Sequence, residues 1–215
     1  PAYRPMKTED LIDALAAGIE PVRPARLSPL LLAGAMLAAV LAVVLLLGVR
    51  PDLHQAMQGP ALWMKALYTA ALAVAAMGLA TRLGRPGVPA APALIALALI
   101  ASAAVLWGGI EMAATPADQR MGMWMGRSSS LCGLYILLAS LFAAPLVFLS
   151  ARRLAPTRPT ASGAALGLVT GALAATAYGL HCAESTAAFV ATWYTLGVAA
   201  AGLIGAVIGR FALRW

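Results

Sequence analysis

The sequence has few of the side chains that soluble enzymes use for chemistry. Among 215 residues there are two cysteines, two histidines and eight acidic residues, and only 11% of the chain is charged. A soluble domain usually has about a quarter of its residues charged. The two cysteines, Cys132 and Cys182, lie far apart, so the chain contains no CxxC motif of the kind used for zinc binding or dithiol exchange.

The sequence also lacks two features that would indicate a transporter or a nucleic-acid-binding protein. No acidic residue lies in the middle of a long apolar run, although such residues usually mark the ion path of a transporter. The net charge of +7 is not gathered into a basic patch with interleaved aromatic residues, so we expect no direct nucleic-acid partner. Most basic residues flank apolar runs, where membrane topology and lipid headgroups explain them.

Long apolar runs are what the chain has in abundance, since 62% of its residues are hydrophobic. A run of about 20 apolar residues can cross a bilayer as a helix. The sequence therefore predicts an all-α fold, a polytopic bundle of six transmembrane helices formed by residues 28–215. The first run is too long for a signal-peptide core, and we expect it to stay uncleaved. The expected spans are 29–49, 62–79, 91–110, 131–149, 163–180 and 187–211, with 111–129 as the longest interior loop.

Residues 1–27 form the second expected unit, a cytoplasmic N-terminal segment. Residues 1–5 are expected to precede a natural start at Met6. A short helix is predicted over 8–17, with Thr8 as its N-cap and Gly18 ending it.

One face of this short helix is apolar, and its acidic residues lie largely off that face. A helix of about ten residues is marginal alone in water, so the apolar face needs a surface to cover it. Two possibilities stay open: the helix rests on its own bundle, or it binds a protein partner. The apolar positions are Leu11, Ile12, Leu15 and Ile19, and the acidic ones are Glu9, Asp10 and Asp13.

Lysine and arginine residues set the expected orientation. Eleven of the fifteen fall in the N-terminal segment, the turns at 82–87 and 150–158 and the C-terminus, and four fall in the segments between. The positive-inside rule then places both termini on the cytoplasmic side of a bacterial inner membrane. Trp63, Lys65 and Tyr68 are expected to anchor the second span at the opposite interface.

This orientation places the sulfur and imidazole groups on the outer side. Cys132 begins the fourth span and Cys182 follows the fifth, next to His181. An oxidising periplasm allows such thiols to pair, and sulfur with imidazole also suits soft metal ions. The dipole at a helix N-terminus predicts that Cys132 is the more reactive thiol. The alternative is that both cysteines are small apolar fillers.

Several stretches of the chain resemble the six-helix membrane anti-sigma factors of the NrsF type, which are negative regulators of an extracytoplasmic-function sigma factor. The resemblance covers residues 6–215. The stretches that support it are Lys7–Ile12, Arg50–Leu53, Trp63–Lys65 with Tyr68 and Thr69, Leu180–Glu184 and Trp193–Gly197.

The resemblance implies a regulator with no catalytic residues, no resident cofactor and no enzymatic activity. Its N-terminal segment would hold the sigma factor, and its cysteine pair, with His181 beside it, would sense heavy metals or oxidants. Membrane lipid is the other expected partner, and the oligomeric state stays open. A small transporter or metal exporter and a membrane thiol oxidoreductase are the alternatives. The expected sigma-binding residues are Leu11, Ile12, Leu15, Asp10 and Asp13, and the expected metal ligands are Cys132 and Cys182.

Overall fold

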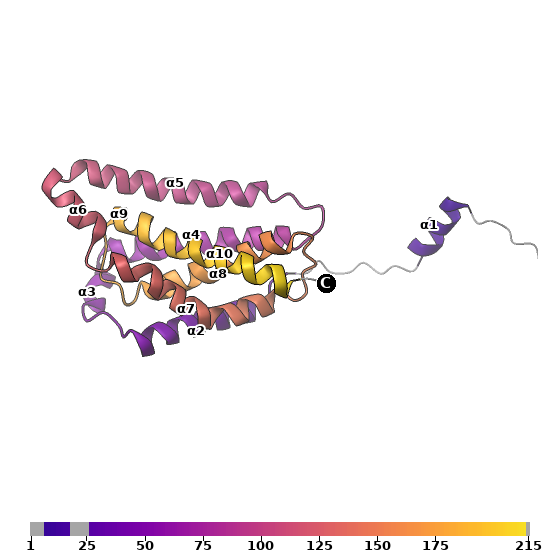
Figure 1. Ribbon diagram of the computed structural model, residues 1–215, viewed down its shortest axis with the longest axis horizontal. Coiled ribbons are helices and arrows are strands. Elements are labelled where there is room, and N and C mark those ends of the chain that lie inside the picture. The colour runs from indigo at the N-terminus through magenta and orange to yellow at the C-terminus, as the bar shows by residue number, and fades with distance from the viewer. Residues whose placement is uncertain (1–6, 18–25, 214–215) are drawn as a thin grey trace, which may run out of the picture.

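The computed structural model describes residues 7–17 and 26–213, and across these ranges every regular element is a helix. The all-α prediction is therefore confirmed for the described residues. The elements, drawn in Figure 1, are α1 (Thr8–Ala16), α2 (Pro29–Leu46), α3 (Leu53–Gln58), α4 (Pro60–Leu83), α5 (Ala91–Ala114), α6 (Ala117–Met125), α7 (Ser129–Ser150), α8 (Pro159–Tyr178), α9 (Ala187–Phe189), the π-helix η1 (Val190–Tyr194) and α10 (Thr195–Ala212).

Among the described residues, six helical segments are long and apolar enough to cross a membrane, as the sequence predicted. They are α2, α4, α5, α7 together with α6, α8, and the continuous helix made by α9, η1 and α10. The prediction that 111–129 is a loop was wrong, because α5 continues to Ala114 and α6 fills most of the remainder. Gly126, at φ +53°, ends α6 in a conformation that favours glycine.

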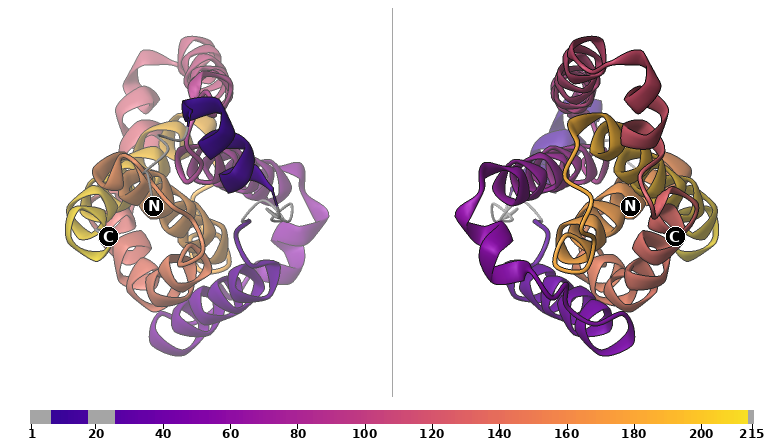
Figure 2. Two further views of the ribbon diagram at one scale, coloured as in Figure 1. Left: turned by 90° about the vertical axis from the view of Figure 1, so that its right-hand side faces the viewer. Right: turned by 90° about the vertical axis from the view of Figure 1, so that its left-hand side faces the viewer.

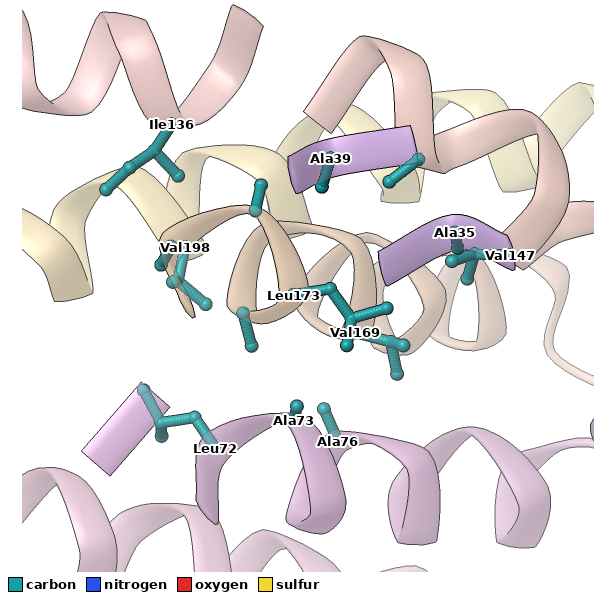
Figure 3. Close-up of a cluster of buried hydrophobic side chains, with 14 of the residues drawn as sticks. Ala35, Ala39, Leu72, Ala73, Ala76, Ile136, Val147, Val169, Leu173 and Val198 are labelled. Atoms are coloured by element: carbon teal, nitrogen blue, oxygen red, sulfur yellow. The ribbon is translucent and has the colours of Figure 1, made fainter. Parts of the chain in front are cut away.

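Helix α8 is the centre of the bundle, with most of its residues buried. Figure 3 shows Val169 and Leu173 of α8 among apolar side chains from the surrounding helices. Alanines of α2 and α4 approach it from two sides, and Ile136 and Val147 of α7 complete the cluster. The mean hydropathy of α8, 1.3, is the lowest of the six candidate spans among the described residues, so its central place does not come from its being the most apolar helix.

Glycines let α8 and α10 approach each other closely. A Cβ atom added to Gly209 would lie 2.5 Å from the Cα atom of Gly163, and one added to Gly167 would lie 2.9 Å from the Cα atom of Gly205. Neither distance is compatible with a side chain, so both glycine pairs set the separation of the two helices.

Two helices stand at the margin. Helix α5 buries only Ala93 and Gly108, and Figure 2 shows it on the outside of the bundle. Helix α1 buries none of its residues, and Figure 1 draws it apart from the bundle. The prediction that Thr8 is the N-cap was wrong, because α1 begins at Thr8 and Lys7 is the capping position, with no side-chain cap. Gly18 and Ile19 lie outside the described residues.

The bundle has two distinct ends. Figure 1 shows α3, α6 and α9 at the end opposite the C-terminal end of α10. We call this the cysteine end, because the loop between α8 and α9, residues 179–186, contains Cys182 and because α7 begins there, close to Cys132. The loop of residues 179–186 is called the Cys182 loop below.

Candidate functional site

The Cys182 loop is tied to the segment that follows α2. The backbone N–H of Arg50 donates to the carbonyl of Leu180 at 3.1 Å. The imidazole Nδ1 of His181 lies 3.0 Å from the carbonyl oxygen of Gly48. Since a carbonyl only accepts, Nδ1 is the donor in this bond. These bonds fix the loop against residues that lie 130 or more positions earlier in the chain.

Two cations hold the carbonyl oxygen of Cys182. Lys65 donates through Nζ at 3.0 Å, and Arg50 donates through Nη1 at 3.3 Å. The Lys65 side chain is only 4% exposed and lies over the ring of Tyr194, with Nζ 5.3 Å from the ring centroid. The expectation that Lys65 is an interface anchor was wrong. The side chain points into the bundle, where its ammonium group donates to the Cys182 carbonyl and makes a cation–π contact with the Tyr194 ring.

Arg50 is itself held by Asp52. Its guanidinium makes two hydrogen bonds to that carboxylate, at 2.8 and 2.6 Å. The bonds lower the pKa of Asp52 and raise the pKa of Arg50 relative to their ordinary values. Asp52 therefore keeps its charge to a lower pH than a free aspartate does, and Arg50 stays oriented toward the Cys182 loop.

Both thiols are free and belong to the same buried cluster. Cys132 lies in the first turn of α7 and is fully buried, and Cys182 is 3% exposed. The rings of Tyr178 and Tyr194, 5.7 Å apart, belong to this cluster too. The position of Cys132 in the first turn agrees with the basis of the reactivity prediction. Its burial opposes the dipole effect, because an apolar environment disfavours a thiolate, and the relative reactivity stays a prediction.

His181 packs among aromatic rings and does not complete a metal site. Its ring makes an edge contact with Tyr135 and a tilted contact with Tyr178, at centroid distances of 6.0 and 5.8 Å. Within residues 7–17 and 26–213, no group of three or more His, Cys, Asp or Glu side chains is placed to hold a metal ion. The described residues thus offer a soft ion a two-sulfur site at most. Metal binding by Cys132 and Cys182 stays a prediction.

Helix α6 is fastened to the segment that follows the Cys182 loop. The indole of Trp124 donates to the Thr192 hydroxyl at 3.0 Å, and the indole of Trp193 donates to the carbonyl of Trp124 at 2.9 Å. The two indole rings lie 5.9 Å apart. Trp193 belongs to the π-helix η1, and π-helical turns are frequent at functional sites. The sequence analysis did not predict this contact between Trp124 and the segment around Trp193.

Two glutamates make further hydrogen bonds between segments at the cysteine end. Glu184 accepts a hydrogen bond from the backbone N–H of Arg127 at 2.8 Å. Glu111, near the end of α5, accepts from the backbone N–H of Ala188 at 3.0 Å. Both carboxylates thus satisfy backbone donors at element ends. They connect α5 and the segment before α7 to the Cys182 loop and α9.

The expected sigma-binding residues lie away from the cysteine end, on α1. Leu11, Ile12 and Leu15 are 42%, 59% and 67% exposed, so the bundle does not cover the apolar face. Asp10 and Asp13 are exposed as well. The possibility that α1 rests on its own bundle is therefore not what the structure adopts.

Comparison with known proteins shows the family of the chain. The family described as negative regulator of sigma F matches residues 15–215. The chain belongs to this family. It is 44% identical to the anti-sigma-F factor NrsF of Caulobacter vibrioides, over 98% of this chain and all of that protein. It is 38% identical to the probable anti-sigma-F factor NrsF of Azospira oryzae, with the same coverage. No solved structure matches the chain.

The stretches that carried the sequence resemblance meet in space. Arg50, Lys65, the Cys182 loop and Trp193 are all at the cysteine end, joined by the bonds described above. The Tyr68 hydroxyl also lies 2.6 Å from the hydroxyl of Thr195. The only such stretch elsewhere is Lys7–Ile12, which contributes to α1. A member of this family of regulators thus has two separate features: the uncovered helix α1, and a pair of buried thiols beside a loop that is hydrogen-bonded to several helices.

Proposed function

We propose that this protein is a membrane-bound anti-sigma factor rather than an enzyme. Its N-terminal helix α1 holds an extracytoplasmic-function sigma factor in the cytoplasm. The bundle lies in the bacterial inner membrane with both termini inside, so the cysteine end faces the periplasm. Oxidants or heavy-metal ions that reach Cys132 and Cys182 release the sigma factor. Family membership supports the sigma-factor partner, and the basic residues near the termini support the orientation.

The observation that carries the proposal is the uncovered face of α1. An amphipathic helix with three exposed large aliphatic residues fits an apolar groove on a protein partner. An anionic membrane surface is a poor alternative, because its charge repels Glu9, Asp10 and Asp13. Asp10 and Asp13 lie off the apolar face, where they contact the rim of the groove and steer the approach of a basic partner.

The thiol cluster supports the sensing role. Oxidation forms one S–S bond as the two thiols lose two protons and pass two electrons to the oxidant. A soft ion such as Cd²⁺ instead binds both sulfurs as they lose their protons. Either event pulls the start of α7 toward the Cys182 loop. That loop is bonded to Lys65 of α4 and to the segment after α2, so the movement is transmitted to several helices.

The required energy is moderate. Moving a two-state switch from 1% to 99% occupancy takes about 5.5 kcal/mol of differential binding. Thiolate–metal bonds supply free energies of this order or more. Metal binding at the cysteine pair therefore releases a bound partner when about this much of its free energy distinguishes the released state from the bound one.

The substitution Leu15→Asp tests the docking face. The added charge should abolish capture of the cognate sigma factor in a pull-down from membranes. The matched control is Ala14→Asp, which places the same charge off the apolar face and should leave capture within about threefold of wild type, as expected for a rim position. Capture by Leu15→Asp that equals that of wild type would show that α1 docks through another face.

A further inference from the structure

A groove opens on the side of the bundle between α4, α5 and the start of the last helix. Its volume is about 530 Å³, within the usual range for small-molecule sites. Most of its wall is apolar, formed by side chains such as Ile100 and Trp107. Its polar lining comes from Lys65, Tyr68, Glu111 and Ser185. The groove lies along helices that are expected to face lipid, so an amphiphile can enter it from the bilayer.

The two charged residues of the groove, Lys65 and Glu111, have opposite charges and do not pair with each other. In the part of the chain that the structure describes, the single ion pair is between Arg50 and Asp52. Lys65 has only a carbonyl and an aromatic ring as partners, and Glu111 accepts a backbone N–H. Neither charge thus has an ion-pair partner at the wall of an apolar groove, which is costly in a medium of low polarity.

Both charged residues also lie near helix ends at the cysteine end of the bundle. Lys65 is five residues into α4, about 7.5 Å from the start of that helix at a rise of 1.5 Å per residue. Glu111 is three residues from the end of α5, about 4.5 Å from that end. Headgroups and their interface occupy about 5 to 8 Å on each side of the hydrocarbon core. A ligand with one chain in the groove would therefore present its headgroup to both residues.

We propose that this groove binds a phospholipid with a primary amine in its headgroup, of the phosphatidylethanolamine class. The phosphate lies toward Lys65, the ammonium group donates to Glu111, and an acyl chain fills the apolar part beside Ile100 and Trp107. Opposite charges on one headgroup match the opposite charges of the groove. A quaternary ammonium has no N–H to donate to Glu111, and an anionic headgroup leaves Glu111 unpaired or repelled.

This site rests on membrane insertion and not on the proposed sigma-factor partner, so the two proposals can fail separately. Lys65 also donates a hydrogen bond to the carbonyl of Cys182. A lipid bound in the groove would therefore affect the position of the Cys182 loop. The lipid would then act as a structural ligand of the cysteine end.

The experiment uses the full chain in nanodiscs with equal amounts of phosphatidylethanolamine, phosphatidylcholine and phosphatidylglycerol. The protein is extracted in mild detergent, and the retained lipids are quantified by mass spectrometry. We expect phosphatidylethanolamine to be enriched about fivefold over each of the other two lipids, the factor for one modest ion pair. Equal retention of the three lipids, or enrichment of phosphatidylglycerol, would overturn the proposal.

Two variants locate the site. Ala103→Phe fills the groove and should abolish the enrichment, whereas Ala98→Phe, at an exposed position of α5 outside the groove, should keep it. Glu111→Gln removes the charge but keeps an oxygen to accept from Ala188, so the fold is preserved while the preference for the amine headgroup is lost. Enrichment that survives both Ala103→Phe and Glu111→Gln would place the lipid elsewhere and overturn the assignment.

Discussion

Lys65 Nζ donates a hydrogen bond of 3.0 Å to the main-chain carbonyl of Cys182, across 117 positions of sequence. The bond is buried, and the carbonyl accepts a second bond from Arg50. The position of Cys182 is thus fixed through its main chain. Since the same loop is bonded to the segment after α2, the chemistry of one side chain is coupled to the packing of several helices.

The two donors to this carbonyl should be non-additive. Lys65→Met or Arg50→Met alone leaves the carbonyl one donor, but the double variant leaves a buried acceptor unsatisfied, at a cost of about 1–3 kcal/mol. We expect a coupling free energy of about 1–2 kcal/mol in a double-mutant cycle of unfolding. The control cycle pairs Lys65→Met with Arg82→Met, whose guanidinium bonds to Pro89. Purely additive effects in the first cycle would argue that the shared carbonyl is unimportant.

The close approach of α8 and α10 should make Gly167 intolerant of any side chain. Gly167→Ala places a Cβ atom 2.9 Å from the Cα atom of Gly205, and we expect a loss of about 1–3 kcal/mol in unfolding free energy. Gly109→Ala is the matched control in α5, where a Cβ atom meets nothing within 4 Å. That variant should be neutral or gain up to about 1 kcal/mol from helix propensity. Equal stability of the two variants would contradict the packing described here.

The cysteine pair should be required for induction. Replacing Cys132 and Cys182 together with serine removes both the S–S bond and the soft ligands, so repression should persist when Cd²⁺ or an oxidant is added. A reporter driven by the cognate sigma factor measures this, and each single serine variant should behave like the double. Full induction in the double variant would assign sensing to other residues.

The orientation of the bundle can be measured with cysteines placed in loops. Because the native thiols are buried, an impermeant maleimide is expected to miss them on either side of the membrane. In the background with both native cysteines replaced, Gln55→Cys in α3 should react in intact cells. Thr157→Cys, in the loop before α8, should react only after lysis; both positions are exposed. The reverse pattern would invert the topology and remove the periplasmic sensor.

The sequence predicted the long helices well, because crossing a bilayer requires about 20 apolar residues with all backbone bonds made within the helix. It also marked the apolar face of α1, since the spacing of Leu11, Ile12 and Leu15 places them together on any helix. Helices α3 and α6 were missed because each is short and only weakly periodic, and neither could span a membrane. Lys65 was misplaced because a lysine at a span terminus is usually an interface residue.

What the sequence determined by itself was the class of the protein: six apolar helices, a leading amphipathic helix, and motifs that resemble a family of sigma-factor regulators. Hydrophobicity and local periodicity are properties of neighbouring residues, so they are visible without a fold. Only the tertiary structure decided that α8 is the centre, that α5 is peripheral, and that Arg50, Lys65 and His181 meet around Cys182. Those relationships join residues more than 100 positions apart, and they depend on which helices pack together.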